Sequence, residues 1–404
     1  MQKILTIVFL LVLAAGTYAQ SVPMDWQTGV PVVNSSRASA LGHTEMFGAL
    51  DGTAMFANPA WMADTHDLNV EIGVSSIFGK TPYDDPIFGN SHEQKYLGSV
   101  KPEYAVASMP LRIHGIPLSL AVGAGIWTMH RPGWDQETTW EEYSSSIGGY
   151  ATYTDKITYD GLIQLVGPAV AADLFDMLYA GLSIGTSTGG TITVKDEQNY
   201  PGNESSDEIS YSPSFQVVTL SAVLRPNKNF KLGVMMRPAY EMTFGDVVYN
   251  LPSIGFSGDG PNTILSMPET IGASFSLTSA DQMIELVGEY QSRQLSKIRY
   301  GVENFELSDV PLDDGQALRL GLQLGAIQAG YFMEDVAVEK TQNERKPAVH
   351  KGFTFGLGYR GHRISLHAFG EYGALEYDRI FNGTTIGIKE TIWRIGGGIG
   401  IHLF

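Results

Sequence analysis

Apolar and polar residues alternate along this sequence with a period of two, from about residue 68 to the end. In the first alternating stretch, Leu68, Val70 and Ile72 fall on one face. Asn69 and Glu71 fall on the opposite face. Because successive side chains of a strand point to opposite sides, the pattern predicts β-strands that each have one apolar face. A soluble β-sandwich gives the same alternation, so periodicity alone leaves both all-β classes open.

The links between the strands favour a membrane barrel over a sandwich. We predict fourteen strands, at residues 68–78, 101–109, 117–130, 156–172, 177–195, 210–224, 230–246, 264–278, 282–296, 316–325, 326–336, 350–360, 362–375 and 388–404. Six short links alternate with seven long ones, which cover residues 79–100, 131–155, 196–209, 247–263, 297–315, 337–349 and 376–387. Up-and-down strands whose long loops all lie on one side of a membrane require this alternation. The sequence therefore predicts an all-β transmembrane antiparallel barrel of about fourteen strands.

Two of the predicted strands contain a proline, at Pro168 and Pro238. Each proline removes one ladder hydrogen bond, so we expect a bend or a local break at both positions. The stretch from residue 162 to residue 178 is also compatible with a buried or interfacial helix, and we favour the strand.

The N-terminus has the pattern of an export signal. Lys3 precedes an apolar run from residue 4 to residue 15, and the small residue Ala19 stands before Gln20. This pattern predicts a signal peptide that is cleaved before Gln20. No later stretch is apolar over the ~18 residues that a transmembrane helix needs. The predicted parts of the chain are the signal peptide, an N-terminal extension with a plug, and the barrel, over residues 1–19, 20–66 and 67–404.

Composition agrees with a barrel and argues against some other classes. The chain has 46 Gly, 19 Tyr and 18 Phe. Glycine relieves crowding in bent strands, and aromatic rings are enriched at the two membrane interfaces. The formal net charge of -17 argues against nucleic acid as a partner, because such binding needs a cationic surface. Since the chain has no Cys, a disulfide framework is excluded.

The residues just before the first strand carry a family resemblance. They include Ser36-Arg37-Ala38-Ser39-Ala40-Leu41-Gly42, then Asp51-Gly52-Thr53-Ala54-Met55-Phe56-Ala57, and then Asn58-Pro59-Ala60. This region resembles the FadL family of outer-membrane transporters for long-chain fatty acids and other hydrocarbons. Weaker similarities follow in the family's order at residues 225–229, 265–269, 318–321 and 329–331. The resemblance implies a fourteen-stranded barrel, an N-terminal plug in its lumen, and diffusion of a hydrophobic substrate through a side opening.

The candidate site residues form two groups. The plug residues that the resemblance implies are Arg37, Gly42, Asn58, Pro59 and Ala60. The candidate substrate contacts are Phe47, Phe56, Arg237, Arg293, Lys297 and Arg319. Because the interior of a barrel is polar, we expect the charged candidates to pair with one another or with the plug. The alternative is that one or two of these cations contact the substrate.

Substrate charge is expected to matter little. At one strand where family members offer a cation, residues 188–191 offer none. We expect the cations of the second group to be matched by Glu241, Glu285 and Glu289, and a satisfied ion pair gains little from a ligand carboxylate. Neutral hydrophobes should then pass about as well as fatty acids.

The function that these features predict is passive outer-membrane transport of small hydrophobic molecules, either fatty acids or neutral hydrocarbons. The alternative is a non-transporting barrel that acts as a docking or secretion-system subunit. We expect no enzymatic activity and no cofactor, and no metal site because the His residues lack ligand spacing such as His-Glu-x-x-His. The expected location is the bacterial outer membrane, with the barrel as a monomer among outer-membrane lipids, inserted by the barrel assembly machinery.

Overall fold

The computed structural model describes most of the chain, namely residues 35–84, 91–96, 100–112, 118–130, 133–144, 149–200, 203–310, 312–339, 345–381 and 384–403. The predicted signal peptide, residues 1–19, and the first part of the predicted extension lie outside the described residues. No helix in this part of the chain is both long enough and apolar enough to cross a membrane.

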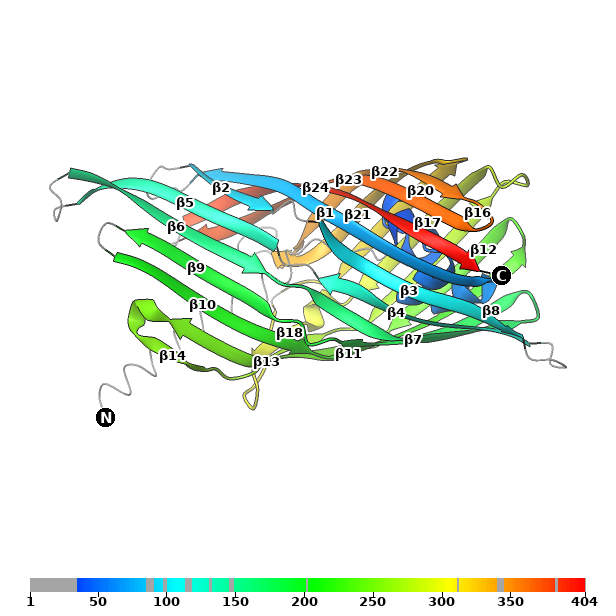
Figure 1. Ribbon diagram of the computed structural model, residues 1–404, viewed down its shortest axis with the longest axis horizontal. Helices are drawn as coiled ribbons and strands as arrows, with labels where there is room; N and C mark the ends of the chain where they lie inside the picture. Colours follow the sequence, from blue (N-terminus) through cyan, green and yellow to red (C-terminus); the bar gives the residue numbers. More distant parts are fainter. Residues whose placement is uncertain are drawn as a thin grey trace.

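Fourteen antiparallel strands close into a barrel (Figure 1). The last strand pairs with the first, from Leu403 opposite Leu68 to Thr391 opposite Lys80. In order around the wall the strands are β1 (Leu68–Asp84), β3 (Val100–Arg112), β4 (Leu118–His130), β7 (Ile163–Leu174), β8 (Leu178–Ser187), β11 (Gln216–Asn227), β12 (Phe230–Arg237), β16 (Thr270–Thr278), β17 (Ile284–Arg293), β20 (Gly315–Leu324), β21 (Ile327–Glu339), β22 (Pro347–Arg360), β23 (Ile364–Phe381) and β24 (Thr384–Leu403). The predicted fold class, an all-β barrel of about fourteen strands with a plug in its lumen, is confirmed.

The links between barrel strands sort to the two ends, as predicted. The short-turn end carries the hairpins β3–β4, β7–β8, β11–β12, β16–β17, β20–β21 and β22–β23. The end of β24 lies here too, because Leu403 pairs with the first residue of β1. The long links join the strands at the other end of the barrel.

Five of the long links contain further strands, which we call the outer strands. They pair edge to edge and continue part of the barrel wall outward (Figure 1). The outer strands are β2 (Ser91–Tyr96), β5 (Gly133–Ser144), β6 (Gly149–Asp160), β9 (Ile192–Tyr200), β10 (Asn203–Ser214), β13 (Tyr240–Leu251), β14 (Phe256–Asp259), β15 (Thr263–Met267), β18 (Arg299–Val302) and β19 (Ser308–Asp309). Two single turns of 3-10 helix lie in the same links: η3 (Pro252–Ile254) between β13 and β14, and η4 (Leu295–Lys297) between β17 and β18.

The outer strands make several predicted boundaries wrong. The predicted strands at residues 156–172, 177–195 and 230–246 each join a barrel strand to part of an outer strand. The predicted loop at residues 131–155 contains β5 and the first half of β6. Outer strands also have one face toward the interior, so the alternation of apolar and polar residues continues across the junction. Periodicity therefore does not mark where the barrel ends.

Both prolines interrupt the sheet, as expected. Pro168 lies inside β7, which confirms a strand and not a helix in this region. The pairing of β7 with β8 skips Gly167 and Pro168, in agreement with a missing backbone donor. Pro238 lies between the end of β12 and the start of β13.

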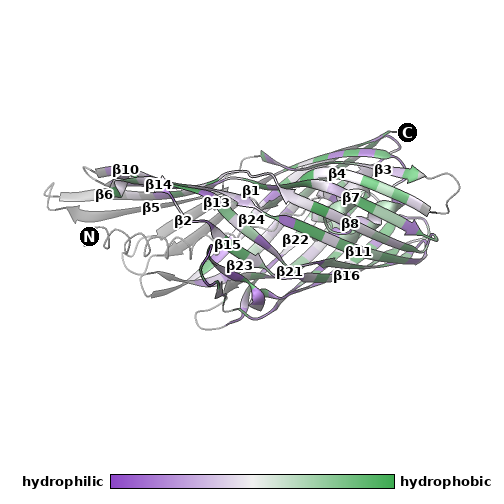
Figure 2. Cartoon of the chain, turned by 90° about the horizontal axis from the view of Figure 1, so that it is seen from below, coloured by the Kyte–Doolittle hydropathy of each residue, from purple (hydrophilic) through white to green (hydrophobic). Residues whose placement is uncertain are grey.

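An apolar belt surrounds the barrel next to the short-turn end. On β24, the outward positions from Trp393 to Leu403 carry large apolar side chains except at Gly397, and the outward position Lys389 lies beyond them. Eleven residues at about 3.3 Å each, tilted by about 40°, span about 25–30 Å, which matches the apolar band of outer-membrane barrels. Figure 2 shows hydrophobic positions along the barrel strands β8, β11 and β16. The outer strands lie beyond this belt, on the side away from the short-turn end.

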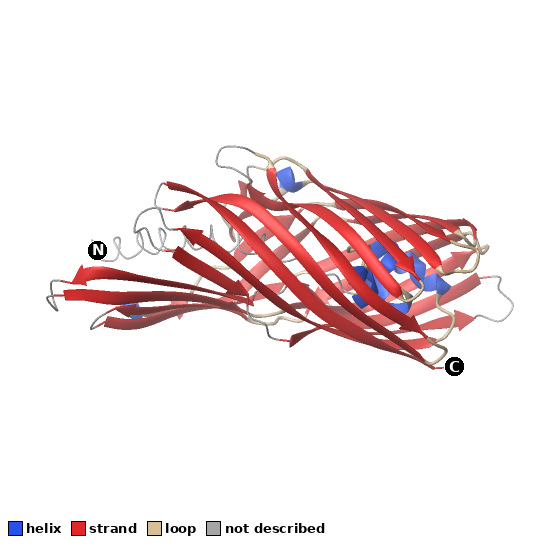
Figure 3. Cartoon of the chain, turned by 90° about the horizontal axis from the view of Figure 1, so that it is seen from above, coloured by secondary structure: helices blue, strands red, loops and turns tan. Residues whose placement is uncertain are grey.

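The plug consists of four short helices inside the barrel, near the short-turn end (Figure 3). They are α2 (Ser36–Ala40), α3 (Glu45–Gly48), η1 (Asp51–Phe56) and η2 (Pro59–Asp64). The hydroxyl of Ser35 caps α2 by accepting from the amide of Ala38 at 3.3 Å. Pro59 occupies the first position of η2, where its missing N–H costs nothing. The proposed boundary between plug and barrel at residue 66 stays a prediction.

Candidate functional site

The lumen around the plug has two chemically different halves. We call the charged side the polar half; its buried or partly buried members include Glu289, Arg293, Arg319, Glu334, Glu371 and Arg394. We call the other side the apolar half; its buried members include Trp127, Ile163, Leu165, Tyr179, Ile192, Val194, Tyr211, Phe215, Val217, Met242, Phe244 and Leu265.

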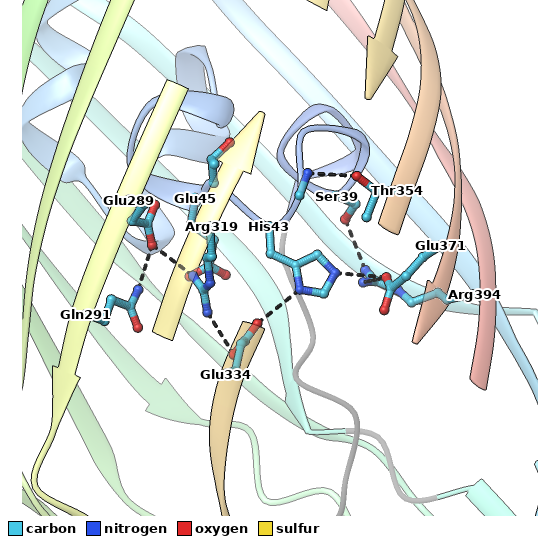
Figure 4. A network of polar contacts seen from close by, with 12 residues as sticks. Ser39, His43, Glu45, Glu289, Gln291, Arg319, Glu334, Thr354, Glu371 and Arg394 are labelled. Atoms are coloured by element: carbon cyan, nitrogen blue, oxygen red, sulfur yellow. Dashed lines mark hydrogen bonds and ion pairs between the residues drawn. The ribbon is translucent and has the colours of Figure 1, made fainter. Parts of the chain in front are cut away.

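His43 is the centre of contact between the plug and the polar half (Figure 4). Its Nδ1 lies 3.2 Å from Glu334 and its Nε2 lies 2.9 Å from Glu371, and all three side chains are buried. The ring stacks on Phe332 with a centroid distance of 4.1 Å. Two carboxylates within ion-pair distance of the two ring nitrogens favour the positively charged imidazolium. Burial alone would lower the pKa of His43, but Glu371 and Glu334 outweigh it and raise the pKa above its usual value.

Two arginines complete this network around His43. Arg319 contacts Glu289 at 2.9 Å and Glu334 at 3.1 Å, and Glu289 also accepts the amide of Met46 in the plug at 2.8 Å. Arg394 contacts Glu103 at 2.6 Å and Glu371 at 3.2 Å. Its guanidinium also donates to the hydroxyl of Ser39 at 3.3 Å (Figure 4). The polar half therefore bonds to the plug at several separate points.

The predicted plug residue Arg37 has a structural role. Its guanidinium contacts Glu285 at 2.5 Å and donates to the carbonyls of Phe47 at 3.1 Å and Gly48 at 2.8 Å. The expected match of Glu285 with a barrel cation is therefore wrong, because the plug supplies the partner.

Gly42 is a point of backbone contact between plug and wall. It has a φ of +68°, and its amide donates to the hydroxyl of Thr354 at 2.8 Å. A Cβ on Gly42 would lie 2.4 Å from the carbonyl oxygen of Leu320, and a Cβ on Gly330 would lie 2.0 Å from the nitrogen of Gly42. Both positions need glycine, because no side chain fits between the two backbones.

Asn58, Pro59 and Ala60 lie where the plug contacts the apolar half. The amide of Asn58 donates to the carbonyl of Met46 at 2.7 Å, and the backbone N–H of Ala60 donates to the hydroxyl of Ser221 on β11 at 2.8 Å. A Cβ on Gly181 of β8 would lie 2.2 Å from the nitrogen of Ala60. These contacts place η2 directly against the wall.

Aromatic rings connect the plug to the apolar half. Phe56 lies 5.0 Å from Trp127, and Phe47 lies 5.5 Å from Trp61, measured between ring centroids. Trp61 lies 6.0 Å from Tyr179 on the wall. The candidate contacts Phe47 and Phe56 are thus on the plug and part of the apolar cluster.

The same apolar cluster continues outward from the plug. It includes the ring pair Tyr211–Phe244 of the outer strands, 5.6 Å apart, and the pair Phe215–Tyr240, 6.0 Å apart, in which Phe215 lies between β10 and β11. Its buried members on β9, β13 and β15 are Ile192, Val194, Met242, Val247, Leu251 and Leu265. One apolar surface therefore extends from the outer strands to the plug.

The four candidate cations have different surroundings. Arg319 pairs with Glu289 as expected, and Arg293 pairs with Glu334 at 2.8 Å, a partner that was not expected. Lys297 is exposed on η4 among the outer strands and does not lie in the buried network.

Arg237 has no ion pair among the described residues. It lies beside the apolar cluster, with a terminal nitrogen 3.4 Å from the carbonyl oxygen of Phe56. Its Nε is buried without a hydrogen-bond partner in the described part of the chain. Glu241, which was expected to match one of the four candidate cations, is exposed and pairs with none of them.

The described residues include no obvious enzymatic or metal site. The spacing Gly-x-Ser-x-Gly occurs at residues 181–185 and 185–189, but Ser183 and Ser187 belong to β8. A serine nucleophile of this motif needs a strand-to-helix turn, which β8 does not have. No group of three or more His, Asp or Glu side chains among these residues has the arrangement to hold a metal ion.

Comparisons with known proteins define the class of fold. No protein-family model matches the sequence, and no match is found among curated proteins. Solved structures match over nearly the whole chain. A Pseudomonas aeruginosa FadL homologue is 11% identical, with a TM-score of 0.59, covering 93% of this chain and 99% of the other.

Two further structures give the same result. The P. putida toluene transporter TodX is 9% identical, with a TM-score of 0.54, covering 93% of this chain and 99% of the other. The Ralstonia pickettii toluene transporter TbuX is 10% identical, with a TM-score of 0.53, covering 94% and 99%. The chain therefore has the fold of FadL-type barrels, and the predicted resemblance is confirmed at the level of the fold.

Proposed function

We propose that this barrel carries small hydrophobic molecules passively across the bacterial outer membrane. The observation that carries the proposal is the apolar cluster, which extends from the outer strands to the plug. A hydrophobic molecule gains about 25 cal/mol for each Å² of apolar surface that it buries there. The structures of similar fold include two toluene transporters, which agrees with such a substrate.

The two halves of the lumen have separate tasks in this proposal. The charges of the polar half pair with one another and with the plug, so they hold the plug and offer little to an apolar ligand. The apolar half offers aromatic and aliphatic surface for the ligand. The molecule binds first among the outer strands, moves along the apolar half and then binds beside Phe56 and Trp127 at the plug.

The environment follows from the same features. The apolar belt fits the hydrocarbon layer of an outer membrane, so lipids are the partners of the outer surface. We infer that the chain works as a monomer and depends on the barrel assembly machinery for insertion. Its proposed role is transport and not catalysis.

Uptake by liposomes that contain lipopolysaccharide and the purified barrel tests the function, because the lipopolysaccharide layer slows the passage of hydrophobic molecules through the lipid itself. The probe is radiolabelled naphthalene, and the variant is Phe215→Ser, which removes a ring that is only 5% exposed in the apolar cluster. Uptake should fall by roughly tenfold, because a ligand that loses about 55 Å² of apolar contact, at about 25 cal/mol per Å², loses about 1.4 kcal/mol of binding free energy. Phe305→Ser is the matched control, because Phe305 is 75% exposed, and it should leave uptake unchanged.

The docking-subunit alternative makes the opposite forecast. A folded wild-type barrel, recognised by its heat-modifiable migration in gels, would then show no naphthalene uptake above empty liposomes. That result would overturn the transport proposal.

A further inference from the structure

A ridge of large apolar side chains stands on the outward side of β22. We call the following outward residues the ridge: Phe353, Phe355, Leu357 and Tyr359. Each of them is between 58% and 64% exposed, whereas Leu320 and Leu322 on the outward side of β20 are 41% and 38% exposed. The ridge protrudes because its neighbours are small, with Ala329 of β21 and Gly370 of β23 directly opposite Phe355.

One end of the ridge belongs to a row of aromatic rings that crosses five neighbouring strands. The row consists of directly opposed residues on β21, β22, β23, β24 and β1, namely Tyr331, Phe353, Tyr372, Trp393 and Phe78. Ring centroids lie 5.2 Å apart in the pair Tyr331–Phe353 and 4.9 Å apart in the pair Tyr372–Trp393. Rows of rings flank the apolar band of outer-membrane barrels, so this one marks the edge of the belt toward the long links.

Two lysines stand just beyond the rings. Lys351 is the next outward residue of β22, and the residues directly opposite it are Met333 and Ala374. Its side chain is exposed and has no ion pair in the described part of the chain. Lys389 of β24 is also exposed and pairs with Glu376 at 3.0 Å. An ion pair with both partners in solvent is weak, so another anion can replace Glu376 at little cost.

The remaining charges near these lysines also favour an anion. Arg345 and Lys346 are exposed where the chain enters β22. Two carboxylates share the cross-strand row of Lys389, and both have partners. Glu376 is paired as described, and Asp335 accepts the backbone N–H of Gln316 at 2.8 Å. The edge of the belt therefore presents cations to a ligand on this side of the barrel.

We propose that this face of the barrel, from the ridge to Lys351 and Lys389, binds the phosphorylated lipid portion of lipopolysaccharide. The inference rests on the proposed location in an outer membrane and not on transport. The long links of outer-membrane barrels are extracellular, so the lysines meet the outer leaflet. Lipid A, the anchor of lipopolysaccharide in that leaflet, carries phosphates on a disaccharide with several acyl chains. Its acyl chains lie along the ridge, and its phosphates bind the two lysines.

The spacing of the two lysines suits a single head group. They stand on either side of β23, about 10 Å apart across the strands and about 7 Å apart along them. Flexible four-carbon stems allow both ammonium groups to reach one phosphorylated disaccharide. The ridge adds the burial of apolar surface, which does not depend on the phosphates. Head-group charge and acyl contact are therefore separable by experiment.

Native mass spectrometry of the purified barrel in detergent tests the site, with diphosphorylated lipid A as the probe. The variant is Lys351→Gln with Lys389→Gln, which removes two charges from exposed positions. Lys228→Gln with Lys195→Gln is the matched control. Lys228 is exposed at the short-turn end, and Lys195 of the outer strands pairs with Glu197, as Lys389 pairs with Glu376. Heat-modifiable migration in gels shows that each variant is folded.

The variant should bind diphosphorylated lipid A about tenfold or more weakly than wild type, the effect of losing two lysines near lipid phosphates. The control pair should bind it like wild type. Lipid A without phosphates should bind equally weakly to the wild-type barrel and to the variant. Phe355→Ala should weaken the binding of both forms of lipid A to a similar degree, because it removes only apolar contact.

Equal binding of diphosphorylated lipid A by wild type and by Lys351→Gln/Lys389→Gln would overturn the site. Wild-type binding that is as tight without the phosphates as with them would overturn it too. Failure of the transport proposal looks different, because it would appear as absent naphthalene uptake and leave the binding of lipid A unchanged.

Discussion

Replacing His43 with Leu tests the charge balance of the polar half. His43, Arg293, Arg319 and Arg394 face four buried carboxylates, on Glu103, Glu289, Glu334 and Glu371. Without the imidazolium, three cations remain for the four carboxylates. Each carboxylate still contacts an arginine, so we expect a loss of about 3 kcal/mol in the free energy of unfolding, the lower end of the range for a broken buried pair.

The cost of His43→Leu should depend on pH in one direction. The pKa of His43 is raised in the folded barrel, so the folded state binds its proton more tightly than the unfolded chain does. The stabilisation is complete below the unfolded pKa of about 6.5 and is lost as the pH rises through the raised folded value. The difference between wild type and His43→Leu should therefore be large at about pH 6 and smaller at about pH 9.

Urea unfolding in detergent micelles at several pH values measures this difference. His350→Leu is the matched control, because His350 is also buried and lies 4.9 Å from Phe332, but it forms no ion pair with a carboxylate among the described residues. The control should not show the same loss. A cost of His43→Leu that is identical at every pH would refute a charged imidazole.

Three further results are expected. Gly330→Ala should displace the plug, since its Cβ would lie 2.0 Å from the Gly42 nitrogen, and protease should then cut the plug of the folded barrel. In the control Gly258→Ala, the nearest atom lies 3.5 Å from the new Cβ, so the plug should stay protected. Arg319→Met should cost about 4 kcal/mol in urea unfolding, because two buried carboxylates lose a partner. A long-chain fatty acid and its neutral alcohol should enter liposomes at similar rates, both through the wild-type barrel and through Arg293→Ala. The expectation would be contradicted if the wild-type barrel strongly preferred the acid and the variant did not.

Arg237 tests the effect of substrate charge more directly than Arg293 does, because Arg293 already pairs with Glu334. It has no ion pair in the described part of the chain and borders the apolar cluster. If a ligand carboxylate binds in the lumen, Arg237→Met should slow uptake of the acid and leave uptake of the alcohol unchanged. Equal rates for both ligands in wild type and variant would support a substrate without charge.

The strands were predictable because lipid on one side and the lumen on the other act on every residue of the wall. This contrast produces the alternation at Leu68, Val70 and Ile72, and the same contrast continues into the outer strands. The alternation therefore predicted where strands occur, but it did not predict at which residue each strand leaves the barrel wall. The turns were predictable because a link of only a few residues can join two strands only at the same end of the barrel.

The site was predictable only where one segment carries its own signal. Asn58-Pro59-Ala60 begins η2 with a proline that fixes its own φ, so the motif identifies the local structure. By contrast, His43 and Glu334 are 291 residues apart in the sequence. Their contact depends on the closure of the barrel around the plug, which no local pattern records. The same reason explains why Arg37, and not a barrel cation, is the partner of Glu285.

The outer strands extend the walls well past the lipid. Strands of twelve residues, such as β6 and β10, are about 40 Å long at about 3.3 Å per residue, and a tilt of about 40° makes them about 30 Å high. In an outer membrane this height lies within the sugars of lipopolysaccharide, a hydrated layer in which apolar molecules dissolve poorly. A molecule captured at the tips would cross that layer behind a protein wall, so its uptake should not depend on the length of the sugar chains around the barrel.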